Sequence, residues 1–266
     1  MRKTVDGLVL RQLQSGDNDR RILVLTATEG KMWISAKGAR SVRSKYAAIS
    51  QQFSYANFEF YEKNGGKWLS GGSANTNFFG LNSDLEGYSL ACYVAQIAEE
   101  ITGENYPADE VLRMTLNTLY AIEKKLKPYA QIKAAYELFA AQISGFAPNI
   151  EECSDCACRD FGEGQALWLD VMNGAILCDE CLKKRGEGLP IPETDKFYTK
   201  NILLPLDSAS LAAIRYVTSA PLQRIFSFSL GEQRSADLFY RACETYLLNH
   251  LERDFDTLHF YNSIKD

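Results

Sequence analysis

Four cysteines in the second half of the chain restrict its fold more than any other feature. They form two C-x-x-C pairs, Cys153 with Cys156 and Cys178 with Cys181, and 21 residues separate the pairs. Two residues between thiols allow a tight turn that directs both sulfur atoms at one ion, and two such turns supply the ligands of a tetrahedral zinc site. Because four thiolates leave no coordination position open, the sequence predicts one structural Zn2+ rather than a catalytic one.

The ligand set has one open point. Cys158 lies two residues after Cys156 and could replace it, although the two-residue spacing within each pair favours Cys156. An iron–sulfur cluster on the same thiolates is an alternative to zinc. Five of the seven cysteines lie between residues 153 and 181, which indicates metal ligation in a reducing compartment rather than a disulfide framework. We therefore expect a cytoplasmic location.

The charge of the chain is unevenly distributed. The whole chain has 29 basic and 34 acidic residues, a net charge of −5, but residues 1–80 hold 12 basic against 6 acidic residues. A partner responds to the local field rather than to the average, so the N-terminal segment is a candidate for binding nucleic acid. The longest apolar stretches are far shorter than a membrane-spanning helix, so we expect no membrane span.

The sequence lacks the common signatures of catalysis. It contains neither the G-x-x-x-x-G-K-[ST] loop of P-loop ATPases nor the G-x-S-x-G turn of serine hydrolases. His250-Leu251-Glu252 matches the H-x-E element of zinc deaminases, but in those enzymes the C-x-x-C pair follows this element, and here both pairs precede it. We therefore interpret His250 as a packing or helix-surface residue and expect a protein that is not an enzyme.

The first 80 residues have the pattern of a small β-barrel. Five short runs are rich in β-branched and aromatic residues, and turn signals such as Asn64-Gly65-Gly66 separate them. The candidate strands are residues 4–10, 21–26, 31–37, 53–61 and 67–71. Five strands in so short a segment favour a closed OB-type barrel, in which closure removes the exposed edges.

Beyond residue 82 the hydrophobic period becomes helical, except within the cysteine segment. Helices are expected from a capping box at Ser83 to about residue 102, over 109–125, from Pro128 to Gly145, over 208–219 and over 235–253. Between the cysteine pairs, residues 166–171 and 174–177 predict two short strands. The fold class is therefore α+β, an N-terminal OB-fold β-barrel followed by an α-helical domain with an inserted four-cysteine zinc segment.

The strand, helix and cysteine patterns predict four segments along the chain. Residues 1–80 form the OB-fold domain, and residues 81–152 form the first part of the helical domain. Residues 153–186 form the zinc-binding segment, and residues 187–266 form the C-terminal part of the helical domain.

A basic cluster directly follows the third candidate strand. Residues 37–45 carry four cations and no acid, so we expect a loop on the barrel that contacts phosphates. The candidate nucleic-acid contacts are Lys37, Arg40, Arg43 and Lys45, with Arg20, Arg21 and Lys31 as further members. The nearby aromatic residues Trp33, Tyr46, Phe53 and Tyr55 could stack on bases. The competing interpretation is a solvated loop whose neighbouring aromatics belong to the core.

Taken together, these motifs resemble RecO, the family of bacterial recombination mediators. The basic barrel, the helical middle, the paired C-x-x-C segment and the helical tail occur in the order of that family, over nearly the whole chain. The local matches are Gly7-Leu8-Val9-Leu10, Lys37-Gly38-Ala39-Arg40, Lys133-Ala134-Ala135-Tyr136-Glu137-Leu138, Gly145-Phe146-Ala147-Pro148 before Cys153, and Leu251-Glu252-Arg253-Asp254-Phe255.

The resemblance implies a non-catalytic protein that handles DNA at the bacterial nucleoid. RecO proteins bind single- and double-stranded DNA, anneal complementary strands and work with RecR. They bind the C-terminal tail of the single-strand DNA-binding protein and help the recombinase load on DNA that this protein coats. By motif position, the resemblance assigns Lys37, Arg40, Arg43 and Lys45 to DNA and the four cysteines to the metal.

Two other functions fit parts of the sequence. A zinc-ribbon adaptor that binds proteins, without direct DNA function, would explain the cysteines and leave the basic loop incidental. A zinc-dependent hydrolase or deaminase would need a water on the metal, which four thiolate ligands exclude.

Overall fold

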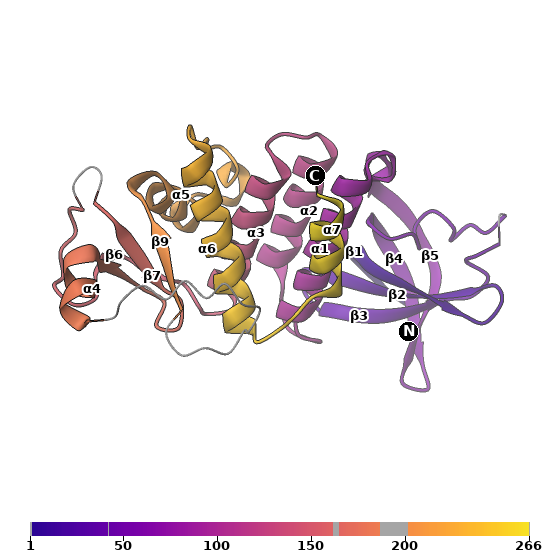
Figure 1. Ribbon diagram of the computed structural model, residues 1–266. Coiled ribbons are helices and arrows are strands. Elements are labelled where there is room, and N and C mark those ends of the chain that lie inside the picture. Colours follow the sequence, from indigo (N-terminus) through magenta and orange to yellow (C-terminus); the bar gives the residue numbers. More distant parts are fainter. Residues whose placement is uncertain (1, 42, 162–164, 187–201, 266) are drawn as a thin grey trace. The chain divides into compact units, whose positions relative to one another are not determined.

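The computed structural model describes residues 2–41, 43–161, 165–186 and 202–265 (Figure 1). Contacts divide the chain into two compact units, one formed by residues 1–126 with 255–266 and one formed by residues 127–254. The predicted segment boundaries at residues 80 and 152 stay a prediction, and the one at residues 186 and 187 falls where the described residues stop.

The first unit is built on the closed five-stranded barrel that the sequence predicts. Its strands are β1 (Arg2–Ser15), β2 (Asp19–Thr26), β3 (Gly30–Ala36), β4 (Ser54–Lys63) and β5 (Gly66–Asn77). They pair in the order β1-β2-β3-β5-β4, and β4 pairs back onto β1. The parallel contact of β3 with β5, at Ser35 and Trp68, completes the OB-type order.

Side-chain alternation explains why these segments form a barrel. Along β3, Met32, Ile34 and Ala36 are buried in the barrel core, whereas Trp33 and Ser35 between them are half-exposed. The hairpin of β4 and β5 turns at Asn64 and Gly65, which both have positive φ, so that the two-residue loop matches the twist of its strands.

Two helices and the C-terminal helix complete this unit. They are α1 (Leu85–Ile101), α2 (Asp109–Glu123) and α7 (Asp256–Ile264), with a 3-10 turn η1 (Phe79–Ser83) before α1. Helix α1 packs against α2 and α7, and the rings of Tyr93 and Phe255 meet edge to face at 5.6 Å. The predicted capping box at Ser83 is wrong by one residue, because Asp84 caps α1 and accepts the amide hydrogen of Gly87.

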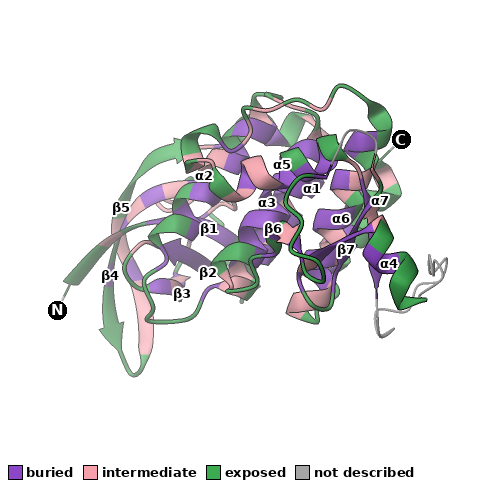
Figure 2. Cartoon of the chain, turned by 90° about the vertical axis from the view of Figure 1, so that its left-hand side faces the viewer, coloured by how far each residue is buried: buried purple, intermediate pink, exposed green. Residues whose placement is uncertain are grey.

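The second unit packs three helices together. They are α3 (Tyr129–Ile143), α5 (Ser208–Ser219) and α6 (Gln233–Leu251), with a short turn η2 (Leu222–Arg224). Helix α3 is buried over most of its length (Figure 2). It carries the charged pair Lys133 and Glu137, and the Lys133 ammonium lies 2.8 Å from Glu137 and 2.6 Å from Glu244 on α6.

A small sheet in this unit holds the cysteine segment. Its strands β6 (Asn149–Cys153), β7 (Leu167–Asp170), β8 (Ala175–Cys178) and β9 (Leu203–Leu206) pair in the order β6-β8-β7-β9. Strands β7 and β8 confirm the two predicted strands, whereas β6, β9 and helix α4 (Asp179–Arg185) were not predicted. Arg215 of α5 donates two hydrogen bonds to the carbonyl of Ile150, which ties the sheet to the helices.

None of the helices within the described part of the chain has the length and apolar character needed to cross a membrane.

Candidate metal centre and nucleic-acid interface

The structure brings the four predicted cysteines together in the second unit. Cys153 ends β6, Cys156 lies in the turn that follows, Cys178 ends β8, and Cys181 lies in the first turn of α4. Their sulfur atoms all lie within 4.8 Å of one another, and the Sγ atoms of Cys156 and Cys178 are 3.8 Å apart. A tetrahedral zinc site with Zn–S bonds of about 2.3 Å needs sulfur separations of about 3.8 Å, so the cluster has the size and the donors to hold such an ion.

Backbone pairing sets the two turns side by side. Strands β6 and β8 run parallel, with Cys153 opposite Ile176, and the amide of Ser154 donates to the carbonyl of Ile176 at 2.8 Å. The first turn closes by a 2.9 Å hydrogen bond from the Ala157 amide to the Cys153 carbonyl, and Ala157 has a positive φ of 55°. The turn therefore places both thiols of the first pair toward the second pair.

The surroundings shift the pKa values of three cluster thiols in different directions. Burial by itself raises the pKa of Cys153. Hydrogen bonds from the backbone amides of Cys178, Cys156 and Asp155 outweigh burial and lower this pKa to about 6. The pKa of Cys178 is raised, chiefly by burial, and that of Cys181 is raised by its hydrogen bond with the Cys178 sulfur. Neighbouring thiolates repel one another, and a bound dication would offset this repulsion because it favours the thiolate form of every ligand.

Cys158 lies outside the cluster. Its side chain is exposed, and its thiol donates to the carbonyl of Asp160 at 3.0 Å. Among the described residues, the group that could hold a metal ion is made of Cys153, Cys156, Cys178 and Cys181. The ligand set that the spacing favours is thus the one that the fold assembles.

An ion pair supports the cluster from outside. The guanidinium of Arg185, the last residue of α4, binds both carboxylate oxygens of Asp155, which lies in the turn between the first two cysteines. A bidentate pair of this kind fixes the orientation of both groups. It joins the end of the short helix to the first turn.

His250 packs in the second unit, away from the described metal cluster. Its Nε2 lies 2.8 Å from the Val171 carbonyl, and its ring stacks on Phe146 and lies 4.2 Å from the ring of Tyr246. Burial lowers its pKa below the usual value for histidine. This confirms the interpretation of His250 as a packing residue.

In the first unit, four predicted cations lie on one segment, described over residues 37–41 and 43–52 and called the cationic loop below. It follows β3 and leads into β4. The side chains of Lys37, Arg40, Arg43 and Lys45 are exposed, and none of them forms an ion pair with another described residue. The Arg40 guanidinium donates to the Asp17 carbonyl at 2.8 Å, and the ammonium groups of Lys37 and Lys45 each lie 4.9 Å from the centre of an aromatic ring. No described carboxylate neutralises these cations, so their charge is available to phosphates.

The cationic loop is held in place by the barrel. Ala39 and Ile49 are buried in the barrel core, so the loop is anchored by two apolar side chains. The Arg40 amide donates to the Asn18 carbonyl at 3.0 Å, and the Tyr46 hydroxyl donates to the Ser70 carbonyl at 2.9 Å. The described residues that carry the cations are thus anchored to the barrel on both sides of the cationic cluster.

Arg20 supports the cationic loop from β2. Its guanidinium donates to the Ala47 carbonyl at 3.3 Å and to the Ser50 hydroxyl at 3.1 Å. Burial, and then the positive charge of Arg40, lower its pKa. Arg20 is therefore engaged with the loop itself, and its role as a DNA contact stays a prediction.

Arg21 and Lys31 lie apart from the loop contacts. The guanidinium of Arg21 lies over the Trp33 ring at 4.9 Å, and Arg11 of β1 lies over the same ring at 5.3 Å. The Lys31 ammonium donates to the Glu99 carbonyl near the end of α1 at 2.5 Å. Lys31 is therefore bound to the helix, at the end where the helix dipole favours a cation.

The aromatic residues divide into exposed and buried groups. Phe53, proposed for base stacking, is buried and belongs to the core, whereas Trp33 and Tyr46 keep part of their surface. The sequence did not indicate that Lys37 lies 4.9 Å over the ring of Trp68 or that Arg11 joins Trp33. Both pairs depend on the strand register of the barrel, which charge and composition do not reveal.

Comparison with known proteins matches both parts of the chain to one family. The model described as "Recombination protein O N terminal" matches residues 1–76, and the one described as "Recombination protein O C terminal" matches residues 82–259. A DNA repair protein RecO of Acetivibrio thermocellus is 24% identical over 258 residues, which cover 97% of this chain and 95% of that protein. A DNA repair protein RecO of Anaeromyxobacter dehalogenans is 28% identical over 265 residues, which cover 99% and 97%.

Proposed function

The chain belongs to the RecO family of DNA repair proteins, and from that premise we propose that it binds single- and double-stranded DNA and anneals complementary strands without catalysing a reaction. The observation that carries the proposal is the cationic loop, whose exposed cations lie on a segment anchored in the core of a closed barrel. Its site of action in the cell is the bacterial nucleoid.

The physical requirements of annealing fit this loop. Two strands repel each other through their phosphates, and cations that replace condensed counterions offset that repulsion. If Lys37, Arg40, Arg43 and Lys45 each contact one phosphate of a single strand, the slope of log affinity against log salt is about −3. The partly exposed ring of Trp33 beside Arg21 offers a surface on which an unpaired base can stack.

The metal in this proposal is one structural zinc ion. Cys153, Cys156, Cys178 and Cys181 would hold it, and its role is to stabilise the fold of the sheet and α4. The ion supplies no chemistry to strands or bases. The work on DNA falls to side chains of the barrel.

The proposed partners are those of a recombination mediator. RecR joins the protein, and the C-terminal tail of the single-strand DNA-binding protein recruits it to coated DNA. Together these partners would help the recombinase load on the strand. Copurification of the purified chain with RecR, and with the single-strand DNA-binding protein with and without its tail, tests each contact separately.

The direct test of the proposed function is an annealing assay. Complementary fluorescent strands, bare or coated with single-strand DNA-binding protein, are mixed with and without this chain, and duplex formation is followed over time. We expect faster duplex formation that slows as salt is raised. If neither annealing nor a gel shift of single-stranded DNA is observed, the DNA function is wrong and the zinc-ribbon adaptor is favoured.

A further inference from the structure

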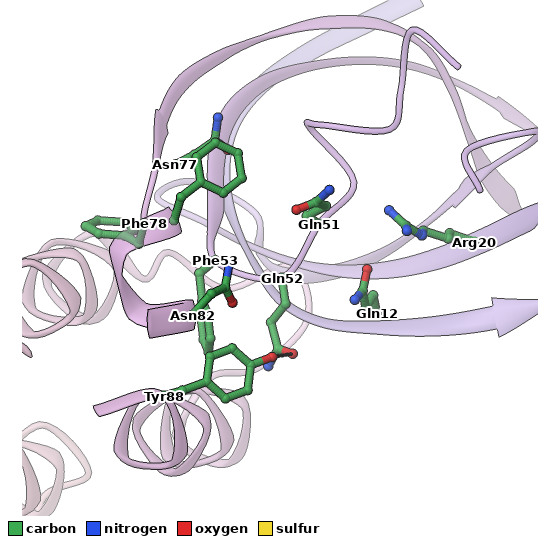
Figure 3. A pocket seen from close by; sticks show the side chains of 10 residues that line it. Gln12, Arg20, Gln51, Gln52, Phe53, Asn77, Phe78, Asn82 and Tyr88 are labelled. Atoms are coloured by element: carbon green, nitrogen blue, oxygen red, sulfur yellow. Dashed lines mark hydrogen bonds between the residues drawn. The ribbon is translucent and has the colours of Figure 1, made fainter. Parts of the chain in front are cut away.

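A polar pocket opens on the barrel at the end of the cationic loop. Its volume is about 110 Å³, and its lining comes from β1, β2, the end of the loop, the end of β5, η1 and the first turn of α1. Figure 3 shows Gln12, Arg20 and Gln51 along one side and Asn77 and Asn82 along the other. By the same measure one water needs about 10–15 Å³, so the pocket has room for a planar group of several heavy atoms.

Carboxamide groups give the pocket its chemistry. Four of them make no side-chain hydrogen bond within the described part of the chain, and they are Gln12, Gln51, Asn77 and Asn82. The Oδ1 atom of Asn77 is buried and has no hydrogen-bond partner among the described residues, so the protein does not use the polar capacity of this carboxamide. Amides offer a donor and an acceptor side by side, the pattern with which Asn and Gln bind base edges.

Aromatic rings form the remaining wall. Phe79 is exposed at the pocket, and Tyr88 is half-buried and packs edge to face against Phe53 at 5.6 Å. The Gln52 side chain is fixed by its 3.0 Å hydrogen bond to the Leu10 carbonyl. The pocket thus combines a rigid back with a ring surface that can stack on a flat ligand.

The pocket is continuous with the cationic loop. Gln51 and Gln52 are the last two residues of that loop, and Arg20 both lines the pocket and holds the loop at Ala47 and Ser50. The loop that carries the cations thus also supplies part of a cavity lined by amides and rings.

We propose that this pocket receives one unpaired nucleobase of a DNA strand whose phosphates lie on the cationic loop. The inference rests on the proposed function and deepens it, because it assigns a base-holding site to the same barrel. In annealing, such a site keeps a base turned away from its own strand, where a complementary strand can pair with its neighbours.

The experiment compares two fluorescent strands of equal length, one with bases and one in which every nucleotide is an abasic analogue. We expect the unchanged protein to bind the strand with bases about five- to a hundredfold more tightly, the range of one stacked base. The pocket variants are Gln51→Leu with Asn82→Leu, and, separately, Phe79→Ala. Each is expected to reduce this preference about fivefold or more while affinity for the abasic strand stays within twofold.

Matched variants control for composition and folding. Phe260→Ala removes an equally exposed ring from α7, since Phe79 is 54% and Phe260 50% exposed. Gln14→Leu removes an exposed glutamine from β1 outside the pocket. Both should retain the full preference for bases. Because Phe79 is exposed, its replacement leaves the core intact, and thermal unfolding verifies this for every variant.

The outcomes distinguish a failure of the proposed DNA function from a failure of the base site alone. Failure of the unchanged protein to bind either strand contradicts the proposed function, and the pocket proposal with it. Equal binding of both strands, or a preference that survives both pocket variants, overturns the base site alone. Displacement of the strand by a hundredfold excess of mixed deoxynucleoside monophosphates would assign the pocket to free nucleotides and overturn the strand assignment.

Discussion

The cysteine cluster and the cationic loop both follow the end of a strand, but their functional groups are arranged differently. The four thiols converge within 4.8 Å on one point, from two strand ends and one helix. The cations of the loop are exposed and spread along one segment, and their contacts are with a carbonyl or an aromatic ring rather than with a common point. Arg20, Arg21 and Lys31 are also each engaged with a carbonyl, a hydroxyl or a ring.

The difference follows from the ligands that the two regions suit. A metal ion needs every donor at bonding distance at once, so the loss of one thiol affects the whole centre. Phosphates are spread along a strand, so each cation contributes separately through counterion release. The comparison predicts large, all-or-none effects in the cluster and smaller, graded effects in the loop.

The largest effect is expected from the metal cluster. Cys153→Ser removes one of four ligands, and because structural zinc contributes about 10–16 kcal/mol in small zinc-dependent folds, we expect a loss of several kcal/mol of unfolding free energy. Cys158→Ser is the matched control, since that thiol lies outside the cluster and its loss should change stability by less than about 0.5 kcal/mol. Thermal unfolding with and without a chelator measures both. Equal stability of the Cys153→Ser and Cys158→Ser variants would contradict the all-or-none effect expected of the cluster.

The buried ion pair of α3 tests whether groups that converge without a metal also cause a large loss of stability when one of them is removed. The Lys133 side chain is buried, and burial by itself lowers its pKa. The carboxylates of Glu137 and Glu244 outweigh burial, so that the pKa of Lys133 is raised. Lys133→Met takes the ammonium away from the fully buried Glu137 and should cost about 3–5 kcal/mol. Lys133→Met combined with Glu137→Met removes both charges and should recover most of the loss. If the double variant is less stable than the single one, the buried charge is not the cause.

Adjacent arginines on β2 sharpen the comparison within the barrel. Arg20→Gln removes hydrogen bonds that hold the cationic loop and should lower the unfolding free energy by about 1–2 kcal/mol. Arg21→Gln removes a cation above the half-exposed Trp33 ring, which is worth about 0.5–1 kcal/mol. Urea unfolding of the two variants shows which substitution causes the larger loss of unfolding free energy. A larger loss from Arg21→Gln would mean that Arg20 does not support the loop.

The smallest effect concerns pH. Burial lowers the pKa of His250 in the folded protein, so the folded state binds its proton less readily than the unfolded state. Its contribution to stability is therefore present above the unfolded pKa of about 6.5 and is lost as pH falls below it. We expect His250→Gln to flatten the decline in unfolding free energy between about pH 7 and pH 5. An identical pH profile in the variant would contradict this assignment.

Much of the fold could be predicted because short-range signals agree with it. The strands of the barrel follow alternation and turn residues such as Asn64 and Gly65, and the spacing of the cysteines predicted the metal cluster. Strands β6 and β9 were missed because they pair with β8 and β7 from far away in the sequence, whereas the equally short β7 and β8 form a local hairpin with a turn signal.

The parts of the nucleic-acid interface that could not be predicted depend on tertiary contacts. Charge identified Lys31 as a candidate, but only the fold shows its ammonium at the Glu99 carbonyl. Phe53 reads as an aromatic beside a basic loop, yet it lies in the core. The pocket at Gln51 and Asn82 joins residues from separate elements that no local pattern connects.

The salt dependence of binding to single-stranded DNA tests the central claim most directly. Arg40, Arg43 and Lys45 are replaced together by Gln, and Arg113, Arg234 and Arg241, exposed on helices, are replaced by Gln in a control of equal net charge. If the loop contacts phosphates, the loop variant weakens binding to every sequence and reduces the slope of log affinity against log salt by about 2, whereas the control keeps the slope of the unchanged protein. A loop variant with the affinity and slope of the unchanged protein would contradict the claim that the barrel binds DNA through this loop.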